Sequence, residues 1–143
     1  MKYLLDTCVI SELIAKRPNP QVVAWVDALD DEDVYLSVIT LGEIKRGIEK
    51  LPDSRRKERL NQWMKEELLA RFHGHIASID PDVMLVWGEL VARMEAHGRT
   101  LPVMDSLIAS IALHGGFILV TRNQRDFDGT GVEIINPWQI SKA

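Results

Sequence analysis

Short apolar runs alternate with helical patterns along the whole chain, and this alternation limits the possible fold more than any other feature. The first run, Tyr3-Leu4-Leu5, is followed at once by an amphipathic pattern. Further apolar runs lie at residues 34–37, 76–78, 117–120 and 132–135, with helical spacing between them. Strands that alternate with helices pair as a parallel sheet with helices on its faces. We therefore expect an α/β fold, a three-layer α/β/α sandwich around a central, mainly parallel twisted sheet of about five strands.

Composition and length fit one globular domain over residues 1–143. Hydrophobic residues make up 46% of the chain and charged residues 27%, enough to bury a core. No apolar run approaches the ~18 residues of a membrane span, and strand material begins too early to leave room for a signal peptide. The single cysteine, Cys8, cannot form an internal disulfide. We therefore expect a cytoplasmic protein that does not contact a membrane.

Three acidic residues stand at equivalent points of the predicted fold. Asp6 follows the first strand, Glu43 lies early in the helix after the second strand, and Asp105 lies in the first turn of a later helix. The carboxyl ends of parallel strands gather at one edge of a sheet, so these acids could meet in space. Each could instead be a helix cap or an exposed acid, as Asp6 or Thr7 would be for the helix that follows.

Three neighbouring carboxylates favour a bound cation. They repel one another, which raises their pKa values unless a cation is present. Magnesium takes oxygen ligands and typically uses one or two carboxylates. A magnesium or manganese ion held in this way can activate water and neutralise a phosphate under in-line attack. Hydrolysis of a phosphodiester is the reaction that such a site suits.

Five stretches of the chain match one known pattern in the expected order, at residues 5–12, 34–43, 105–109, 120–123 and 136–138. Through them the chain resembles the PIN-domain ribonucleases, specifically the VapC/FitB-type toxins of type II toxin–antitoxin pairs. The resemblance spans nearly the whole chain and is more specific than any single acid. It implies a metal-dependent endoribonuclease that hydrolyses RNA phosphodiester bonds with metal-activated water at an acidic pocket, inhibited by a cognate antitoxin.

The resemblance also implies a role for each acid. Asp6 and Asp105 would be the direct ligands of Mg²⁺, with Mn²⁺ as the alternative ion, and Glu43 would complete the acidic triad. Thr7 would lie beside the first ligand, where its hydroxyl could bond a phosphate or an adjacent carboxylate. Thr121, at the end of the fourth strand, would support the same site.

One position departs from the family pattern. Many relatives carry a fourth acid shortly after the Thr-Arg turn, where this chain has Asn123. An asparagine can coordinate through its carbonyl oxygen or orient a carboxylate, but it adds no negative charge. We assign the fourth catalytic position to Asn123 and keep Asp126, three residues further on, as its alternative. The number of metal ions, one or two, stays open.

Basic residues concentrate between residues 45 and 71. This segment holds nine Lys or Arg residues and five acids, a balance of +4 in a chain whose net charge is −4. Such a lobe can attract a phosphate backbone, although two solvated helices would carry similar charge. If RNA is the substrate, we expect this segment to steer its phosphates toward the acids. The candidate RNA-binding residues are Lys45, Arg46, Arg55, Arg56 and Lys57, within a cluster that extends to Arg59.

The resemblance implies partners as well. A cognate VapB/FitA-like antitoxin, a small dimeric DNA-binding protein, would occupy the toxin's groove with its C-terminal tail. Operator DNA would be reached only through this antitoxin, and the toxin would be a homodimer within a higher toxin–antitoxin assembly. The alternative is a catalytically weak PIN-like binding module that acts mainly in an antitoxin and operator DNA complex. The three retained acids favour the enzyme.

Two other α/β classes with an acid after the first strand fit less well. A haloacid-dehalogenase-type phosphatase needs a second aspartate two residues after the first, where this chain has Cys8. A response-regulator receiver needs a phosphoacceptor aspartate after the third strand. That region supplies only Asp80, which precedes Pro81 as a helix cap.

Overall fold

Five parallel strands form the centre of the molecule. The structure is a computed structural model that describes residues 1–140; residues 141–143 of the expected domain lie outside the described residues. The strand order is β3-β2-β1-β4-β5, and every neighbouring pair is parallel. The predicted α/β class is confirmed. The strands are β1 (Tyr3–Leu5), β2 (Val34–Ser37), β3 (Ile76–Ala77), β4 (Ile118–Val120) and β5 (Ile134–Ile135).

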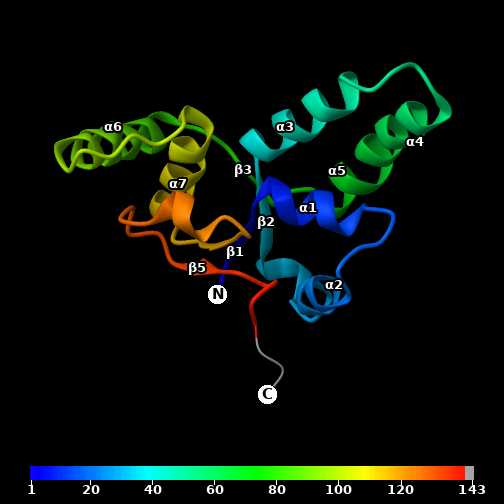
Figure 1. The fold of residues 1–143 in the computed structure, drawn as a ribbon, viewed down its shortest axis with the longest axis horizontal. Coiled ribbons are helices and arrows are strands. Elements are labelled where there is room, and N and C mark those ends of the chain that lie inside the picture. The colour runs from blue at the N-terminus through cyan, green and yellow to red at the C-terminus, as the bar shows by residue number, and fades with distance from the viewer. Residues whose placement is uncertain (141–143) are drawn as a thin grey trace.

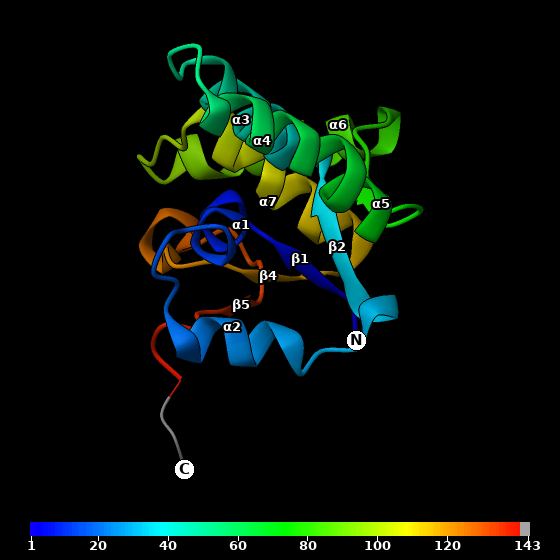
Figure 2. The same ribbon diagram turned by 90° about the vertical axis from the view of Figure 1, so that its right-hand side faces the viewer.

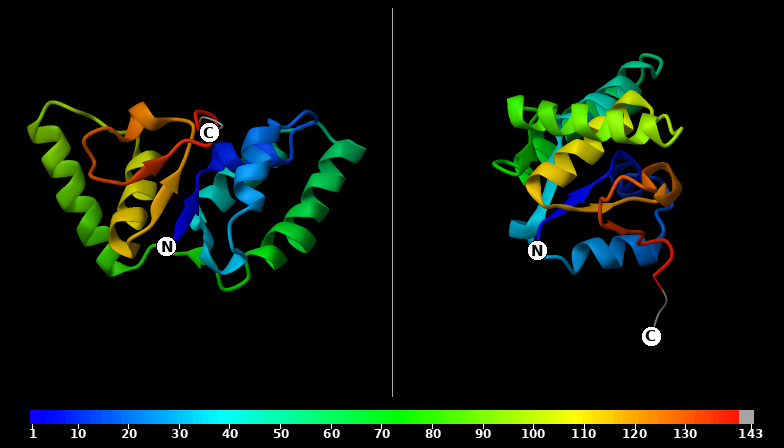
Figure 3. Two further views of the ribbon diagram at one scale, coloured as in Figure 1. Left: turned by 90° about the horizontal axis from the view of Figure 1, so that it is seen from below. Right: turned by 90° about the vertical axis from the view of Figure 1, so that its left-hand side faces the viewer.

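Helices cover both faces of this sheet, which gives the expected three layers. Figure 1 shows α6 and α7 on one side of the strands and α1, α2 and α4 on the other. Seen from below, α6 and the α4–α5 segment lie at opposite ends of the molecule (Figure 3). The helices are α1 (Thr7–Leu13), α2 (Pro20–Asp27), α3 (Val38–Glu49), α4 (Arg55–Trp63), α5 (Leu69–Arg71), α6 (Pro81–Ala96) and α7 (Val103–Gly115).

Alternate residues of the central strand β1 face the two helical layers. Leu5 packs in a cluster with residues of α1, α2 and α3, whereas Leu4 packs in a second cluster with residues of α6 and α7. Both leucines are 1% exposed. A strand buried on both faces is a continuous apolar run, and this explains why Tyr3-Leu4-Leu5 lacks polar alternation.

Local signals in the sequence set most helix ends. The Asn19 side chain accepts from the N–H groups of Gln21 and Val22 at the start of α2, with Pro20 in the first turn. At its C-terminal end, α7 stops at Gly115 and is capped by Gly116, whose φ of +67° favours glycine. These boundaries follow from the chain's own capping residues.

The polar helix expected through about Arg71 contains an irregular turn. Residues Met64–Leu68, labelled η2, form a π-helical turn between α4 and α5. Buried residues recur here every four positions, at Met64, Leu68 and Phe72, a longer repeat than the 3.6 residues of an α-helix. The wider turn keeps these side chains on one face.

Within residues 1–140, no helix has both the length and the apolar character that a membrane span requires.

The strand ends that matter for function lie at one edge of the sheet. Strands β1, β2 and β4 are parallel neighbours. Asp6 and Thr121 directly follow β1 and β4, and Ser37 is the last residue of β2, so the three residues lie at the same edge of the sheet. Residues 136–140, which follow β5, run past α2 (Figure 2). They are held to this helix by the Gln21 side-chain amide, which donates to the carbonyls of Pro137 and Ile140.

We expect Leu36→Ala to lower the free energy of unfolding by about 3 kcal/mol, because it leaves a cavity in the core beneath β2. Leu36 is fully buried (0% exposed). Urea denaturation followed by circular dichroism measures the loss. The matched control is Leu85→Ala, which truncates a leucine that is 68% exposed, and an equal loss in both variants would contradict this account of the core.

Candidate functional site

Asp6 joins the end of the central strand to the first helix. The N–H of Thr7 donates to Oδ1 (2.8 Å) and the hydroxyl of Thr121 donates to Oδ2 (2.8 Å). The residue is 6% exposed. Burial raises the pKa of its carboxyl, with a smaller contribution from the charge of Glu43, while the bonds from Thr121 and Thr7 oppose the rise. Asp6 is thus both the cap of α1 and a buried carboxylate at the sheet edge.

Thr121 ties the loop after β4 to this carboxylate. Its hydroxyl oxygen is fully buried and accepts a hydrogen bond from the N–H of Asn123 (3.1 Å). The thiol of Cys8 lies on the same group, with Sγ 3.6 Å from Thr121 Oγ1 and 3.8 Å from Asp6 Oδ2. Burial, and then the charge of Asp6, raises the pKa of Cys8. The cysteine is therefore a neutral thiol that packs behind the site.

Glu43 reaches the site from α3 and is held by Thr7. The Thr7 hydroxyl donates to Glu43 Oε1 (2.6 Å), and its oxygen lies 3.1 Å from the hydroxyl oxygen of Thr40. Of the two partners expected for Thr7, a phosphate or a neighbouring carboxylate, the structure contains the carboxylate. Glu43 itself is exposed, so this bond is what fixes one of its oxygens beside the strand ends.

Asp105 brings the third acid from the first turn of α7. The residue is half-buried. Burial raises the pKa of its carboxyl to about 6, with further contributions from the charges of Asp6, Asp126 and Glu43 in that order. Four carboxylates from four separate segments therefore share one electrostatic field. The convergence expected of Asp6, Glu43 and Asp105 is present in the fold.

The fourth acid of this field is Asp126, which lies in the short helical turn Gln124–Phe127 (η3). Its negative charge contributes to the raised pKa of Asp105, after burial and the charge of Asp6. Asn123 lies at the start of the same turn and is held through its backbone N–H by Thr121. Among residues 1–140, no hydrogen bond joins the Asn123 side chain to the acids. The structure thus places both candidates for the fourth position in one turn, and only Asp126 adds charge.

The donor set fits a hard divalent cation. It includes the carboxylates of Asp6 and Asp105, whose pKa values are raised by burial first and then by the charges of neighbouring acids, and a cation relieves the repulsion between such charges. The oxygens of Asp6, Glu43 and Asp105 do not all lie within 4.8 Å of one another. Magnesium accepts such spacing because it retains several waters and needs only one or two carboxylates.

A groove of about 720 Å³ opens beside these acids between α1, α3 and α4. Thr7 and Glu43 line it, together with apolar side chains that include Ile44, Leu60 and Trp63. Its basic lining residues are Lys16, Arg56 and Arg59. The groove therefore runs from the acidic site along a mixed apolar and basic wall.

The basic residues expected to bind RNA do not all face this groove. Of the five, Arg56 lines it. Lys45 contacts Glu49 (2.8 Å) and Asn61 (2.8 Å), and Lys57 lies 3.6 Å from Asp53 and donates to the Glu49 carbonyl. Arg46 and Arg55 are exposed and are not among the groove's lining residues.

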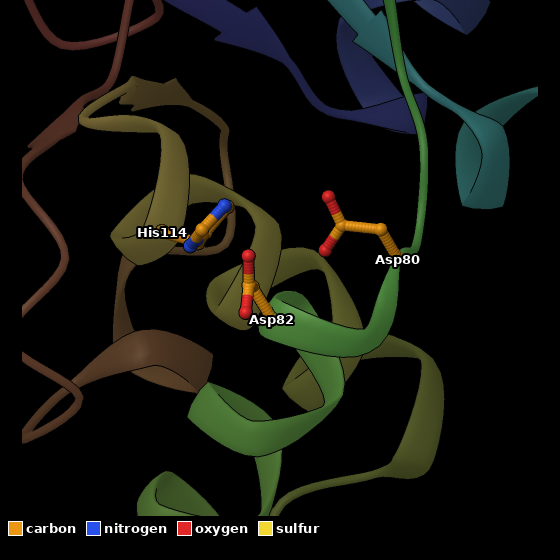
Figure 4. A group of neighbouring side chains, drawn as sticks. All are labelled: Asp80, Asp82 and His114. Carbon is orange, nitrogen blue, oxygen red and sulfur yellow. The ribbon is translucent and has the colours of Figure 1, made fainter.

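A second group of potential metal ligands lies elsewhere on the surface. Asp80 and Asp82 come from the start of α6 and His114 from the last turn of α7, and their side chains point toward one another (Figure 4). All three are exposed. Asp80 also caps α6 by accepting from the N–H of Val83 (2.8 Å). His114 and Asp105 are separated by about 13 Å along α7, so this group is distinct from the acids at the sheet edge.

Sequence reasoning missed two hydroxyl residues and one lysine near the site. The hydroxyl of Thr40 contacts the hydroxyls of both Ser37 and Thr7, while Lys16 lines the groove. The spacing Ser37, Thr40, Glu43 was the available signal, because residues three apart share one face of a helix. Lys16 gave no such signal, since it follows α1 and only the tertiary structure brings it to the groove that Arg56 and Arg59 also line.

The chain matches the family model described as "PIN domain" over residues 3–132. Three curated relatives align over almost their whole length. The plasmid stability protein StbB of Pseudomonas syringae is 38% identical, covering 95% of this chain and 98% of that protein. Toxin FitB of Neisseria gonorrhoeae is 36% identical (94% and 97%), and a VapC ribonuclease of Sinorhizobium fredii is 35% identical (95% and 97%).

Solved structures of toxin–antitoxin complexes also contain chains similar to this one. A structure of FitAB bound to a DNA fragment contains a chain with 35% identity and a TM-score of 0.93, with 98% of each chain covered. A VapBC2 complex from Rickettsia felis, bound to a fragment of its promoter DNA, contains a chain with 26% identity and a TM-score of 0.79, covering 95% of this chain and 98% of that one.

We expect Asp105→Asn to stabilise the protein in EDTA-containing buffer by an amount that depends on pH. The folded-state pKa of Asp105, about 6, exceeds its ordinary value of 3.8, so folding disfavours the charged form. The wild-type chain therefore loses stability as pH rises from about 4 to about 6, and the variant escapes this loss. Thermal unfolding of both proteins from pH 4 to pH 8 measures the difference in Tm. A difference that is constant over this range would contradict the assignment.

Proposed function

The chain belongs to the PIN-domain family, and on this premise we propose that it is the toxin of a toxin–antitoxin pair, a metal-dependent endoribonuclease. The observation that carries the proposal is that four carboxylates lie close enough to act on one another: after burial, the charges of Asp6, Asp126 and Glu43 raise the pKa of Asp105. Neighbouring carboxylates repel one another, and a bound divalent cation stabilises them in their charged form. RNA is the proposed substrate because similar chains are named VapC ribonucleases.

Each acid has a role in this proposal. Asp6 and Asp105 are the direct metal ligands, and Glu43 completes the triad. Mg²⁺ or Mn²⁺ bound there would activate water and offset the charge of the phosphate during in-line attack. Thr121 and Thr7 keep Asp6 and Glu43 in place through the hydrogen bonds they donate. Because these donors are part of the chain itself, the carboxylates are oriented before substrate arrives.

The fourth position has two candidates within one turn. The charge that Asp126 exerts on Asp105 supports a direct contribution to cation binding. The family pattern supports Asn123, whose carbonyl oxygen can accept or coordinate without adding charge. We propose that Asp126 supplies the charge and that Asn123, anchored by Thr121, supplies a neutral oxygen.

The groove beside Glu43 offers a path for RNA. Lys16, Arg56 and Arg59 line it, and each can contact a phosphate. Lys45 and Lys57 are already paired with acidic side chains, so we assign them a smaller part. Of the five residues expected to bind RNA, only Arg56 is kept, and Lys16 and Arg59 are added because they line the groove.

The proposed partners are an antitoxin and, through it, operator DNA. Structures similar to this chain are toxin–antitoxin complexes bound to DNA fragments. The apolar part of the groove, with Ile44, Leu60 and Trp63, suits the C-terminal tail of a VapB/FitA-like antitoxin. We further propose that residues 1–143 form one PIN domain, that the toxin is a homodimer, and that it acts in the cytoplasm.

We expect the protein, purified free of antitoxin, to cleave structured RNA with Mg²⁺ or Mn²⁺ and to lose this activity in EDTA. Asp6→Asn should lower kcat/KM on the order of 100-fold or more, because it removes a charge that the metal site needs. Sequencing of the RNA ends gives the cleavage site.

The matched control is Asp82→Asn, which removes an exposed carboxylate of the Asp80–Asp82–His114 group and should leave cleavage unchanged. Cleavage that survives EDTA, or that Asp6→Asn leaves intact, would rule out the metal-nuclease proposal and favour the PIN-like binding module.

The same assay on Asp126→Asn and Asn123→Ala tests the fourth position, where we expect the larger loss of kcat/KM from Asp126→Asn.

We expect the double variant Arg56→Gln/Arg59→Gln to flatten the salt dependence of kcat/KM. Each lost phosphate contact reduces the slope of log(kcat/KM) against log[salt] by about 0.7 for a single strand, so two contacts give about 1.4. Lys50→Gln/Lys65→Gln is the control, since both lysines are exposed and belong to the same basic segment outside the groove. Equal slopes in all three proteins would mean that the groove does not bind the RNA backbone.

A further inference from the structure

A chain of hydroxyl groups connects the end of β2 with Glu43. Ser37 Oγ lies 3.4 Å from Thr40 Oγ1, which lies 3.1 Å from Thr7 Oγ1, which in turn lies 2.6 Å from Glu43 Oε1. Ser37 and Thr40 are almost completely buried, with 1% and 0% exposure. The far end of the chain is therefore inaccessible to water, while Glu43 is exposed.

The direction of every hydrogen bond in this chain follows from the number of hydrogens. An ionised carboxylate only accepts, and each hydroxyl has one hydrogen to donate. Thr7 gives its hydrogen to Glu43, so the hydrogen between Thr7 and Thr40 comes from Thr40. The hydrogen between Thr40 and Ser37 must then come from Ser37, whose oxygen also accepts from the N–H of Thr40 (3.1 Å). Each hydroxyl thus donates once and accepts once, all toward Glu43.

This arrangement gives Thr40 a specific task. The Thr7 hydroxyl can rotate about its bond to carbon, and its hydrogen could turn away from Glu43. A donor fixed at its oxygen orients the remaining hydrogen toward Glu43 Oε1. Thr40 is suited to be that donor, because it is buried in α3 and has Ser37 as its own donor. Glu43 itself has several rotatable bonds, and an exposed side chain of this kind gains order only from such a contact.

We propose that Thr40 is a positioning residue for Glu43, acting through Thr7. The inference rests on the proposed nuclease function, because it assigns Thr40 a part in setting the acidic site. Thr40 is fully buried (0% exposed), so it acts on the site only through Thr7. Its effect is to hold one Glu43 oxygen in place, which leaves the other oxygen for the site.

The test compares Thr40→Val, which keeps the shape and removes the hydroxyl, with Thr40→Ser, which keeps the hydroxyl. We expect Thr40→Val to lower kcat about 10-fold with little change in KM, the scale of losses from groups that orient metal ligands. Thr40→Ser should recover most of the activity. Ser110→Ala is the matched control. It removes a hydroxyl that is 0% exposed and that, within the described residues 1–140, bonds only the Ser106 carbonyl of its own helix, and it should leave kcat unchanged.

A double-mutant cycle with Glu43→Gln separates positioning from general loss of structure. If Thr40 acts through Glu43, adding Thr40→Val to Glu43→Gln should cause no further loss in single-turnover cleavage, because the group being positioned has already been changed. A further 10-fold loss in the double variant would overturn the inference.

Manganese binding supplies a readout that does not depend on cleavage. We expect Mn²⁺ to raise the Tm of the wild-type protein, and to raise the Tm of Thr40→Val by less than that of Ser110→Ala. Loss of cleavage in Glu43→Gln but not in Thr40→Val would overturn the role of Thr40 and leave the proposed nuclease standing. No effect of Mn²⁺ on the wild-type protein, together with no cleavage, would overturn both.

Discussion

The burial of the Asp6 carboxylate at the end of the central strand is the constraint on which the site depends. A buried carboxylate is costly unless its oxygens accept hydrogen bonds. Here the Thr7 N–H and the Thr121 hydroxyl supply them, one from the start of α1 and one from the end of β4. Both donors come from the ends of neighbouring segments, so they hold the acid at the edge of the sheet.

The same constraint organises the surrounding segments. Thr121 also receives the N–H of Asn123, so the turn that carries Asp126 begins at a fixed point beside Asp6. On the other side, Thr7 connects to Glu43 and to the buried Thr40. Two threonines therefore link Asp6, Glu43 and the turn that carries Asp126 to the core. Burial, and then repulsion from Asp6, Asp126 and Glu43, raises the pKa of Asp105, and a bound cation would offset the cost of that repulsion.

Charge along the sequence was a poor guide to the basic surface, for a physical reason. The segment between residues 45 and 71 comprises the end of α3, then α4, η2 and α5, and two of its lysines pair with neighbouring acids. Only those side chains on the face that α4 turns toward α1 and α3 line the groove, such as Arg56 and Arg59. Lys16 joins them from a segment that is distant in sequence.

The sequence by itself determined the parallel sheet and most helix boundaries, because each depends on local patterns such as the apolar run before Asp6 and the cap at Asn19. It also predicted that Asp6, Glu43 and Asp105 gather at one edge of the sheet. The match of five motifs also identified the family, which the comparisons confirm. Only the tertiary structure decided which other groups join the acids. Asp126, Thr40 and Lys16 meet the site through the packing of separate segments, and no local pattern encodes the distance between side chains that lie on different elements.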